Sequence, residues 1–219
     1  MNKEWSELNK TMQILLKKPD TYKQGIAVLS ELRNELLKTV LSFREEMTKD
    51  DFNAMPFINA KGYHSKSIAY SLWHIFRIED IVAHTLISGE EQVFFSGNYD
   101  KRTGSPIITT GNELTGSQIA DFSEKLDIDE LYSYMTDVKK STDIILSDLD
   151  YVDLKRKISD DRKRELVALN VVSDDENAVW LIDYWCGKDI RGLIQMPFSR
   201  HWIMHIEACI RIKDKLMKR

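Results

Sequence analysis

The chain has 219 residues, of which 42% are hydrophobic and 30% charged, with 31 Lys and Arg against 35 Asp and Glu for a formal net charge of −4. This composition is typical of a soluble globular protein that buries one sizeable core, and the negative charge argues against a main task of gripping nucleic acid phosphates. There is no run of about 20 apolar residues that could span a membrane, no signal-peptide pattern at the start, and only two cysteines, Cys186 and Cys209. We therefore expect a single domain over residues 1–219 in the reducing cytoplasm.

Scarce glycine and proline favour a helical fold. The 9 Gly and 4 Pro fall between long stretches with helical periodicity. A short amphipathic helix is expected at about 4–16. After it, Thr21 followed by Gln24 matches a capping box and predicts a long helix that ends near Met47. Its apolar stripe consists of Tyr22, Ile26, Leu29, Leu32, Leu36, Val40 and Phe43.

Two further long helices are separated by a segment of different character. One is expected from about Ser65 to Ile87, with Gly89 ending it, and the other begins at Asp127, whose carboxylate caps the helix with Glu130 at the third position. The segment 89–126 is rich in Gly, Ser and Thr and predicts an ordered loop. Because such long loops are uncommon in compact domains, we expect it to carry function or a partner contact.

The last third of the chain predicts a second long connection and a final helix. Residues 151–157 are β-capable, the mixed charge run 156–165 is expected to be a solvated surface, and 177–194 predicts an additional helix ending near Gly192. Pro197 and Phe198 open the last helix. The pattern as a whole predicts an all-α fold, a four-helix bundle with an extra N-terminal helix and two elaborated connections, 89–126 and 154–194.

Three of the five histidines form a candidate metal site. His201 and His205 are four residues apart, so they share one face of the last helix, away from its polar arc. Two imidazoles buried without partners would cost about 1–3 kcal/mol each, and one metal ion would satisfy both. His74, on the apolar side of the second long helix, is the expected third ligand. His84 falls about 80° away and is expected at the surface, and His64 lies about 15 Å from His74 along the axis. Histidines satisfied by the protein alone remain the alternative.

At these residues the chain resembles a known family. The segments SLWHIFRIED (71–80) and RHWIMHIEACIR (200–211) are similar to the DinB-like (YfiT-type) metalloprotein superfamily, and the likeness spans about Tyr22 to the C-terminus. The resemblance implies a four-helix bundle in which His74, His201 and His205 bind a divalent metal. Characterised members of that family include transferases and isomerases that use low-molecular-weight thiols.

Three neutral histidines would leave the metal with open coordination positions, unlike a closed structural zinc site. An open site activates water or a substrate thiol, and an all-nitrogen donor set suits zinc, nickel, iron(II) or cobalt. We therefore expect a metal-dependent hydrolase or thiol transferase that acts on a small molecule, with its catalytic residues unassigned. Arg77 and Arg200 are the candidate contacts for an anionic substrate, with surface salt bridges as the alternative.

Other interpretations stay open at this stage. A non-catalytic stress-response or binding bundle, with a structural metal or none, is the main alternative. Nucleic acid binding through 155–164 has the least support, and a homodimer is expected. Cys209 is expected in the core rather than as a ligand. Glu79 lies on an apolar helix side, where a charge more often pairs with a basic residue of a neighbouring helix than serves as a general base. The tryptophans are expected mostly in the core, with pocket lining as the alternative.

Overall fold

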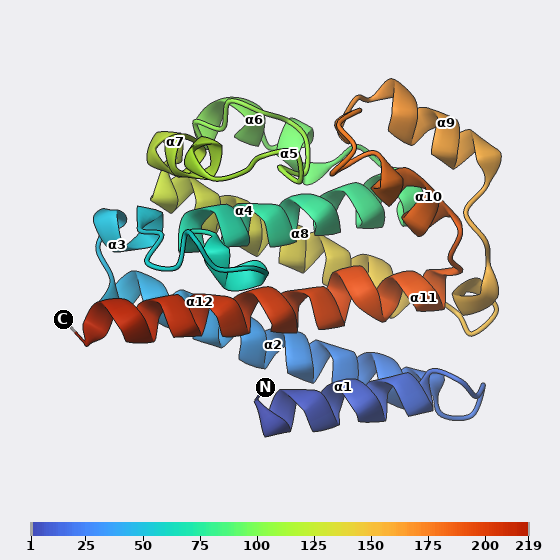
Figure 1. Cartoon of the computed structure of the whole chain (residues 1–219). Coiled ribbons are helices and arrows are strands. Elements are labelled where there is room, and N and C mark those ends of the chain that lie inside the picture. The colour runs from blue at the N-terminus through green and yellow to red at the C-terminus, as the bar shows by residue number, and fades with distance from the viewer. Residues whose placement is uncertain (1, 219) are drawn as a thin grey trace.

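The computed structural model describes residues 2–218, and within them the chain is helical with no β-strand, as predicted (Figure 1). The β-pairing of the segment 151–157 is limited to an isolated bridge between Lys157 and Asp189. The α-helices are α1 (Lys3–Leu15), α2 (Tyr22–Glu46), α3 (Lys49–Asn53), α4 (Ile68–Asp80), α5 (Val93–Ser96), α6 (Tyr99–Arg102), α7 (Ser117–Lys125), α8 (Ile128–Asp148), α9 (Asp160–Ala168), α10 (Trp180–Cys186), α11 (Ile190–Ile194) and α12 (His201–Met217). Two stretches are π-helical. η2 (Ile81–Ser88) extends α4, and η4 (Met196–Arg200) directly precedes α12. Short 3₁₀ turns occur at η1 (Tyr63–Ser65) and η3 (Asp153–Lys155).

Four long helices pack around a common core. α2 contacts α8, α8 contacts α4, α4 contacts α12, and α12 contacts α2 in turn, while α1 lies along α2. Every residue of α4 is buried, so this helix occupies the centre of the molecule. The polar side chains of α4 therefore need partners from neighbouring elements, because an unpaired buried charge is strongly destabilising.

The first long connection is partly helical rather than a plain loop. α4 and α8 run in the same direction (Figure 1), so the chain has to return along their length between them. α5, α6 and α7 make this return, and they contact α4, α8 or both. The second connection likewise contains α9, α10 and α11, so the single helix expected over 177–194 is in fact two short ones.

The predicted helix ends are mostly correct. Asp127 caps α8 by accepting a hydrogen bond from the Glu130 N–H (3.0 Å), and Gly89 ends η2 with a left-handed φ of 78°. The capping box at Thr21 is wrong. Its hydroxyl instead donates to the carbonyl of Leu15 (2.7 Å), which ties the α1–α2 turn together, and the side chain makes no hydrogen bond to the first turn of α2.

A buried ion pair joins the four long helices. Arg33 on α2 donates from both terminal nitrogens to the Glu79 carboxylate on α4, at 2.7 and 2.8 Å, and both side chains are fully buried. The Nε of Arg33 donates to Asp143 on α8 (2.8 Å), and Trp202 on α12 donates its indole N–H to Glu79 (2.8 Å). The pairing predicted for Glu79 is therefore confirmed, and it connects α2, α4, α8 and α12.

The expectation that His84 lies at the surface is wrong, since its side chain is 2% exposed. Its Nδ1 lies 2.8 Å from the Asp80 carboxylate, and its Nε2 lies 2.8 Å from the Ser141 hydroxyl on α8. Asp80 also accepts the first two backbone N–H groups of α5 and the hydroxyl of Tyr134. The polar side of α4 is thus covered by α5 and α8, which the periodicity of α4 alone could not indicate.

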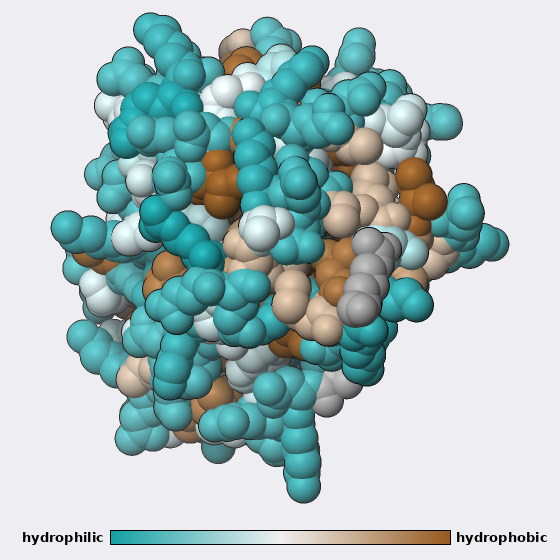
Figure 2. All heavy atoms as spheres, turned by 90° about the vertical axis from the view of Figure 1, so that its left-hand side faces the viewer, coloured by the Kyte–Doolittle hydropathy of each residue, from teal (hydrophilic) through white to brown (hydrophobic). Residues whose placement is uncertain are grey.

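The surface at one end of the molecule is mostly hydrophilic. Figure 2 shows the face seen from the left of Figure 1, where polar side chains are broken by smaller apolar patches. Among the described residues, no helix combines the length and the apolar character that crossing a membrane would require.

The buried ion pair generates a stability prediction. Glu79→Gln leaves the Arg33 guanidinium buried without the charge of its main partner, so we expect a loss of about 3–5 kcal/mol of unfolding free energy, measured by urea denaturation. Asp129→Asn removes an exposed ion pair with Arg44 and should cause almost no change. Equal, small losses in both variants would contradict the structural role of Glu79.

His84 generates a pH prediction. Burial disfavours the charged imidazole, but the hydrogen bonds and negative charge of Asp80 outweigh it and raise the pKa of His84 above 6.5. A raised pKa in the folded state stabilises the protein fully below about pH 6.5, and this contribution disappears as the pH rises through the folded pKa. The stability difference between wild type and His84→Gln should therefore shrink across that range in urea titrations. A difference that is constant with pH would refute the His84–Asp80 interaction.

Candidate metal centre

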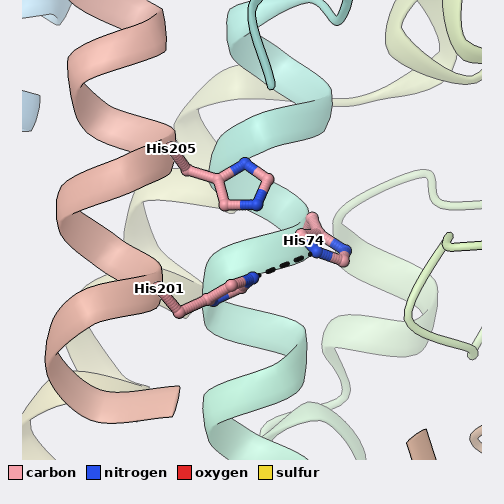
Figure 3. Close-up of side chains that lie close together, drawn as sticks. All are labelled: His74, His201 and His205. Carbon is pink, nitrogen blue, oxygen red and sulfur yellow. Dashed lines mark hydrogen bonds between the residues drawn. The ribbon is translucent and has the colours of Figure 1, made fainter. Parts of the chain in front are cut away.

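Two packed helices bring three histidines together. His74 lies in the middle of α4, and His201 and His205 occupy the first and second turns of α12, which packs on α4. Figure 3 shows the three rings converging, with the Nε2 atoms of His74 and His201 3.2 Å apart. One ligand atom from each histidine lies within 4.8 Å of the others, and all three side chains are buried. The residues singled out from the sequence are therefore close enough to bind one ion.

One pair of donor atoms already has the separation expected of a tetrahedral metal site. Two nitrogens bound to one zinc at about 2.0–2.1 Å with a tetrahedral angle are about 3.3–3.4 Å apart, and the observed separation between His74 and His201 is 3.2 Å. The Nδ1 atoms of His201 and His205 are buried without a hydrogen-bond partner. The protein alone therefore leaves these two imidazoles incompletely satisfied.

Burial keeps all three imidazoles neutral. Burial, together with the positive charge of Lys66, lowers the pKa of His74 to about 4 despite the opposing hydrogen bond to the Thr110 carbonyl. Burial and the other histidines hold the pKa values of His201 and His205 well below 6.5. Neutral imidazoles have free lone pairs at pH 7, which is the state that metal binding requires.

The first long connection supports the site from one side. The Nδ1 of His74 donates to the backbone carbonyl of Thr110 (2.7 Å), which fixes the ring and leaves its Nε2 lone pair toward the other histidines. Gly111 follows with a left-handed φ of 76° and accepts a hydrogen bond from the Tyr70 hydroxyl (2.8 Å). The segment 89–126 thus contributes directly to the site.

Neither predicted anion contact lies beside the histidines. Arg77 is fully buried, donates from Nε to the carbonyl of Ile108 (2.9 Å) and stacks over Phe94, so it anchors the first connection. Its burial reflects the cover that α5 and the following loop place over α4. Arg200 is exposed at the end of η4, and it does not line the cavity described below. The geometry gives no support to a role for either residue in binding an anion.

A cavity of about 230 Å³ opens onto the histidines. Its lining comes from α4, α10, α12, η1, η4 and the first connection, and consists of Tyr63, His74, Ile78, Asn112, Trp180, Leu181, Tyr184, Trp185, Met196, Pro197, His201 and His205. Tyr63 packs edge-on against His205, with ring centroids 4.6 Å apart. Sequence reasoning missed Tyr63, Asn112 and Tyr184 as residues that line this cavity. The one available signal was the four-residue spacing of Trp180 and Tyr184, which places both on the same face of a helix.

Two other candidates lie outside the cluster. His64 packs against Phe57, with ring centroids 5.6 Å apart, and is not part of the three-histidine group. Cys209 is buried in the core, where burial raises its pKa to about 12. A thiol with so high a pKa is a poor metal ligand at neutral pH, which agrees with the prediction of a core cysteine.

This candidate centre rests on its donor set and its geometry. Three neutral nitrogen donors, one of them oriented by a backbone carbonyl, border a cavity large enough for a small molecule. No family model and no curated protein matches this sequence.

Proposed function

We propose that His74, His201 and His205 hold one divalent metal ion in a metal-dependent enzyme of the DinB-like four-helix type. The observation that carries this proposal is the convergence of three buried, neutral imidazoles at the wall of a cavity. A structural zinc site is closed by four protein ligands. Here the described residues offer three ligands, and the cavity leaves room for a substrate beside them.

The reaction we propose is hydrolysis or thiol transfer. When bound, a divalent ion with nitrogen ligands lowers the pKa of a contacting water or thiol toward neutrality. Zinc, nickel, iron(II) and cobalt all suit the donor set. The neutral histidines leave the positive charge of the ion uncompensated, and Thr110 holds His74 in place. The largely apolar lining lowers the polarity around the site, which strengthens its electrostatic effect on a substrate.

Two structural observations support the family assignment within this proposal. The two segments that resemble the DinB-like pattern, 71–80 and 200–211, fall on α4 and the start of α12, and these helices pack directly on one another. The four long helices contact each other in the cyclic order α2, α8, α4 and α12. Both observations agree with a bundle that places its ligands on facing helices.

A second candidate function is a binding protein in which the ion is structural. The observation that favours it is the absence of Asp, Glu, Lys and Arg among the residues that line the cavity. No charged side chain is therefore available there as a general acid or base. The effect of metal removal on folding separates the two candidates.

The metal site generates a binding prediction. Alanine at His74, His201 or His205 should weaken zinc binding by more than the about 10–100-fold typical of losing an outer-shell partner, measured by isothermal titration calorimetry. The matched control is His64→Ala, which removes a histidine outside the cluster and should leave one zinc bound per chain. Unchanged zinc affinity in the His201 variant would contradict the site.

Metal removal distinguishes catalysis from a structural role. If the site is catalytic, chelation should abolish turnover of a model ester or thiol acceptor and shift the melting temperature only slightly, because the buried Arg33–Glu79 pair still joins the helices. A fall in melting temperature of more than about 10 °C would instead identify a structural ion.

A further inference from the structure

The cavity beside the histidines has a largely aromatic wall. The short helix α10 supplies Trp180, Tyr184 and Trp185, and η1 supplies Tyr63. Trp180 and Tyr184 are one helical turn apart and pack edge to face, with ring centroids 5.6 Å apart. Trp185 is buried in the core, whereas Trp180 is 49% exposed. About half of the Trp180 surface is therefore not covered by the protein, at the edge of the cavity.

The lining carries no charged side chain that could neutralise an ionic ligand. Asn112 is the amide in the wall. Its Oδ1 accepts a hydrogen bond from the Thr110 hydroxyl (3.0 Å), so its Nδ2 remains free to donate to a ligand. Lys66 does not line the cavity, and its ammonium lies 5.4 Å from the centre of the Tyr70 ring. A charged group of a ligand would therefore find no counter-charge in the wall itself, and only the metal ion of the proposed function could compensate it.

The volume restricts the ligand further. A cavity of about 230 Å³ is smaller than the roughly 300–1,000 Å³ of sites for drug-sized ligands. The space next to the histidines therefore suits one ring with a short substituent.

We propose that the substrate of this site is a small molecule with a single aromatic ring and no charged group away from its metal-binding atom, bound between Trp180, Tyr184 and Tyr63 with that atom toward the three histidines. Aromatic rings in edge-to-face or offset contact attract each other beyond simple area burial. The proposal rests on the metal-dependent function proposed above, and it replaces the anionic substrate expected from the sequence.

Ligand discrimination tests the proposal on the zinc-loaded full chain. Isothermal titration calorimetry would compare phenylmethanethiol, ethanethiol and the dianionic mercaptosuccinate, with zinc content measured beforehand. Phenylmethanethiol should bind at least about 10-fold more tightly than either of the others, because it alone fills the aromatic wall. Equal affinities, or tighter binding of mercaptosuccinate, would overturn the proposal.

Matched variants localise the effect. Trp180→Ala and Tyr184→Ala should weaken phenylmethanethiol binding by about 5–10-fold and leave the zinc content and ethanethiol affinity unchanged. Ile144→Ala removes a side chain of similar exposure, 56%, on α8 and outside the cavity, so it should change none of these values. Unaltered phenylmethanethiol binding in the Trp180 and Tyr184 variants would overturn the proposal.

A metal-independent probe separates this inference from the function on which it rests. Benzyl alcohol should change the tryptophan fluorescence of metal-free wild type, and Tyr184→Ala, which keeps every tryptophan, should need about 5–10-fold more of it for the same change, while butanoate should change the fluorescence of neither protein. If zinc does not bind and benzyl alcohol still does, the metal function fails and the aromatic site stands. If zinc binds and the preference for a ring is absent, the aromatic substrate is wrong and the metal centre stands.

Discussion

The bidentate ion pair between Arg33 and Glu79 fixes how the four long helices meet. Both groups are fully buried, so they are stable only where each finds its partner. Trp202 and Asp143 complete the pair from α12 and α8. A shift of any of these helices by one turn would leave a charge in the core without compensation. This constraint sets the axial position of α4 against α12.

That axial position determines the geometry of the three-histidine cluster. His201 directly precedes Trp202, and Glu79 lies five residues beyond His74 on the same helix. The contact between Trp202 and Glu79 therefore holds the helix segments that carry His201 and His74 side by side, and their Nε2 atoms meet at 3.2 Å. The two long connections, 89–126 and 154–194, then complete the site that the long helices begin. One orients His74 through Thr110, and the other lays α10 over the site as an aromatic wall.

Helical periodicity was sufficient to predict the long helices and the histidines. It defines the apolar face of each helix, so His74, His201 and His205 could be placed on faces that point inward. It does not show what covers a polar face. His84 and Arg77 therefore appeared exposed, although α5, α8 and the loop near Ile108 bury both of them. Tyr63 and Asn112 belong to irregular segments, where no repeating pattern indicates which way a side chain points.

The central claim is that three imidazoles from two helices share one ion. Anomalous diffraction at the zinc absorption edge, from crystals of the zinc-loaded protein, measures this directly. We expect one peak per chain, within about 2.0–2.1 Å of a ring nitrogen of each of His74, His201 and His205. A peak bound elsewhere, or full zinc occupancy with any of these three nitrogens turned away from it, would contradict the proposed site.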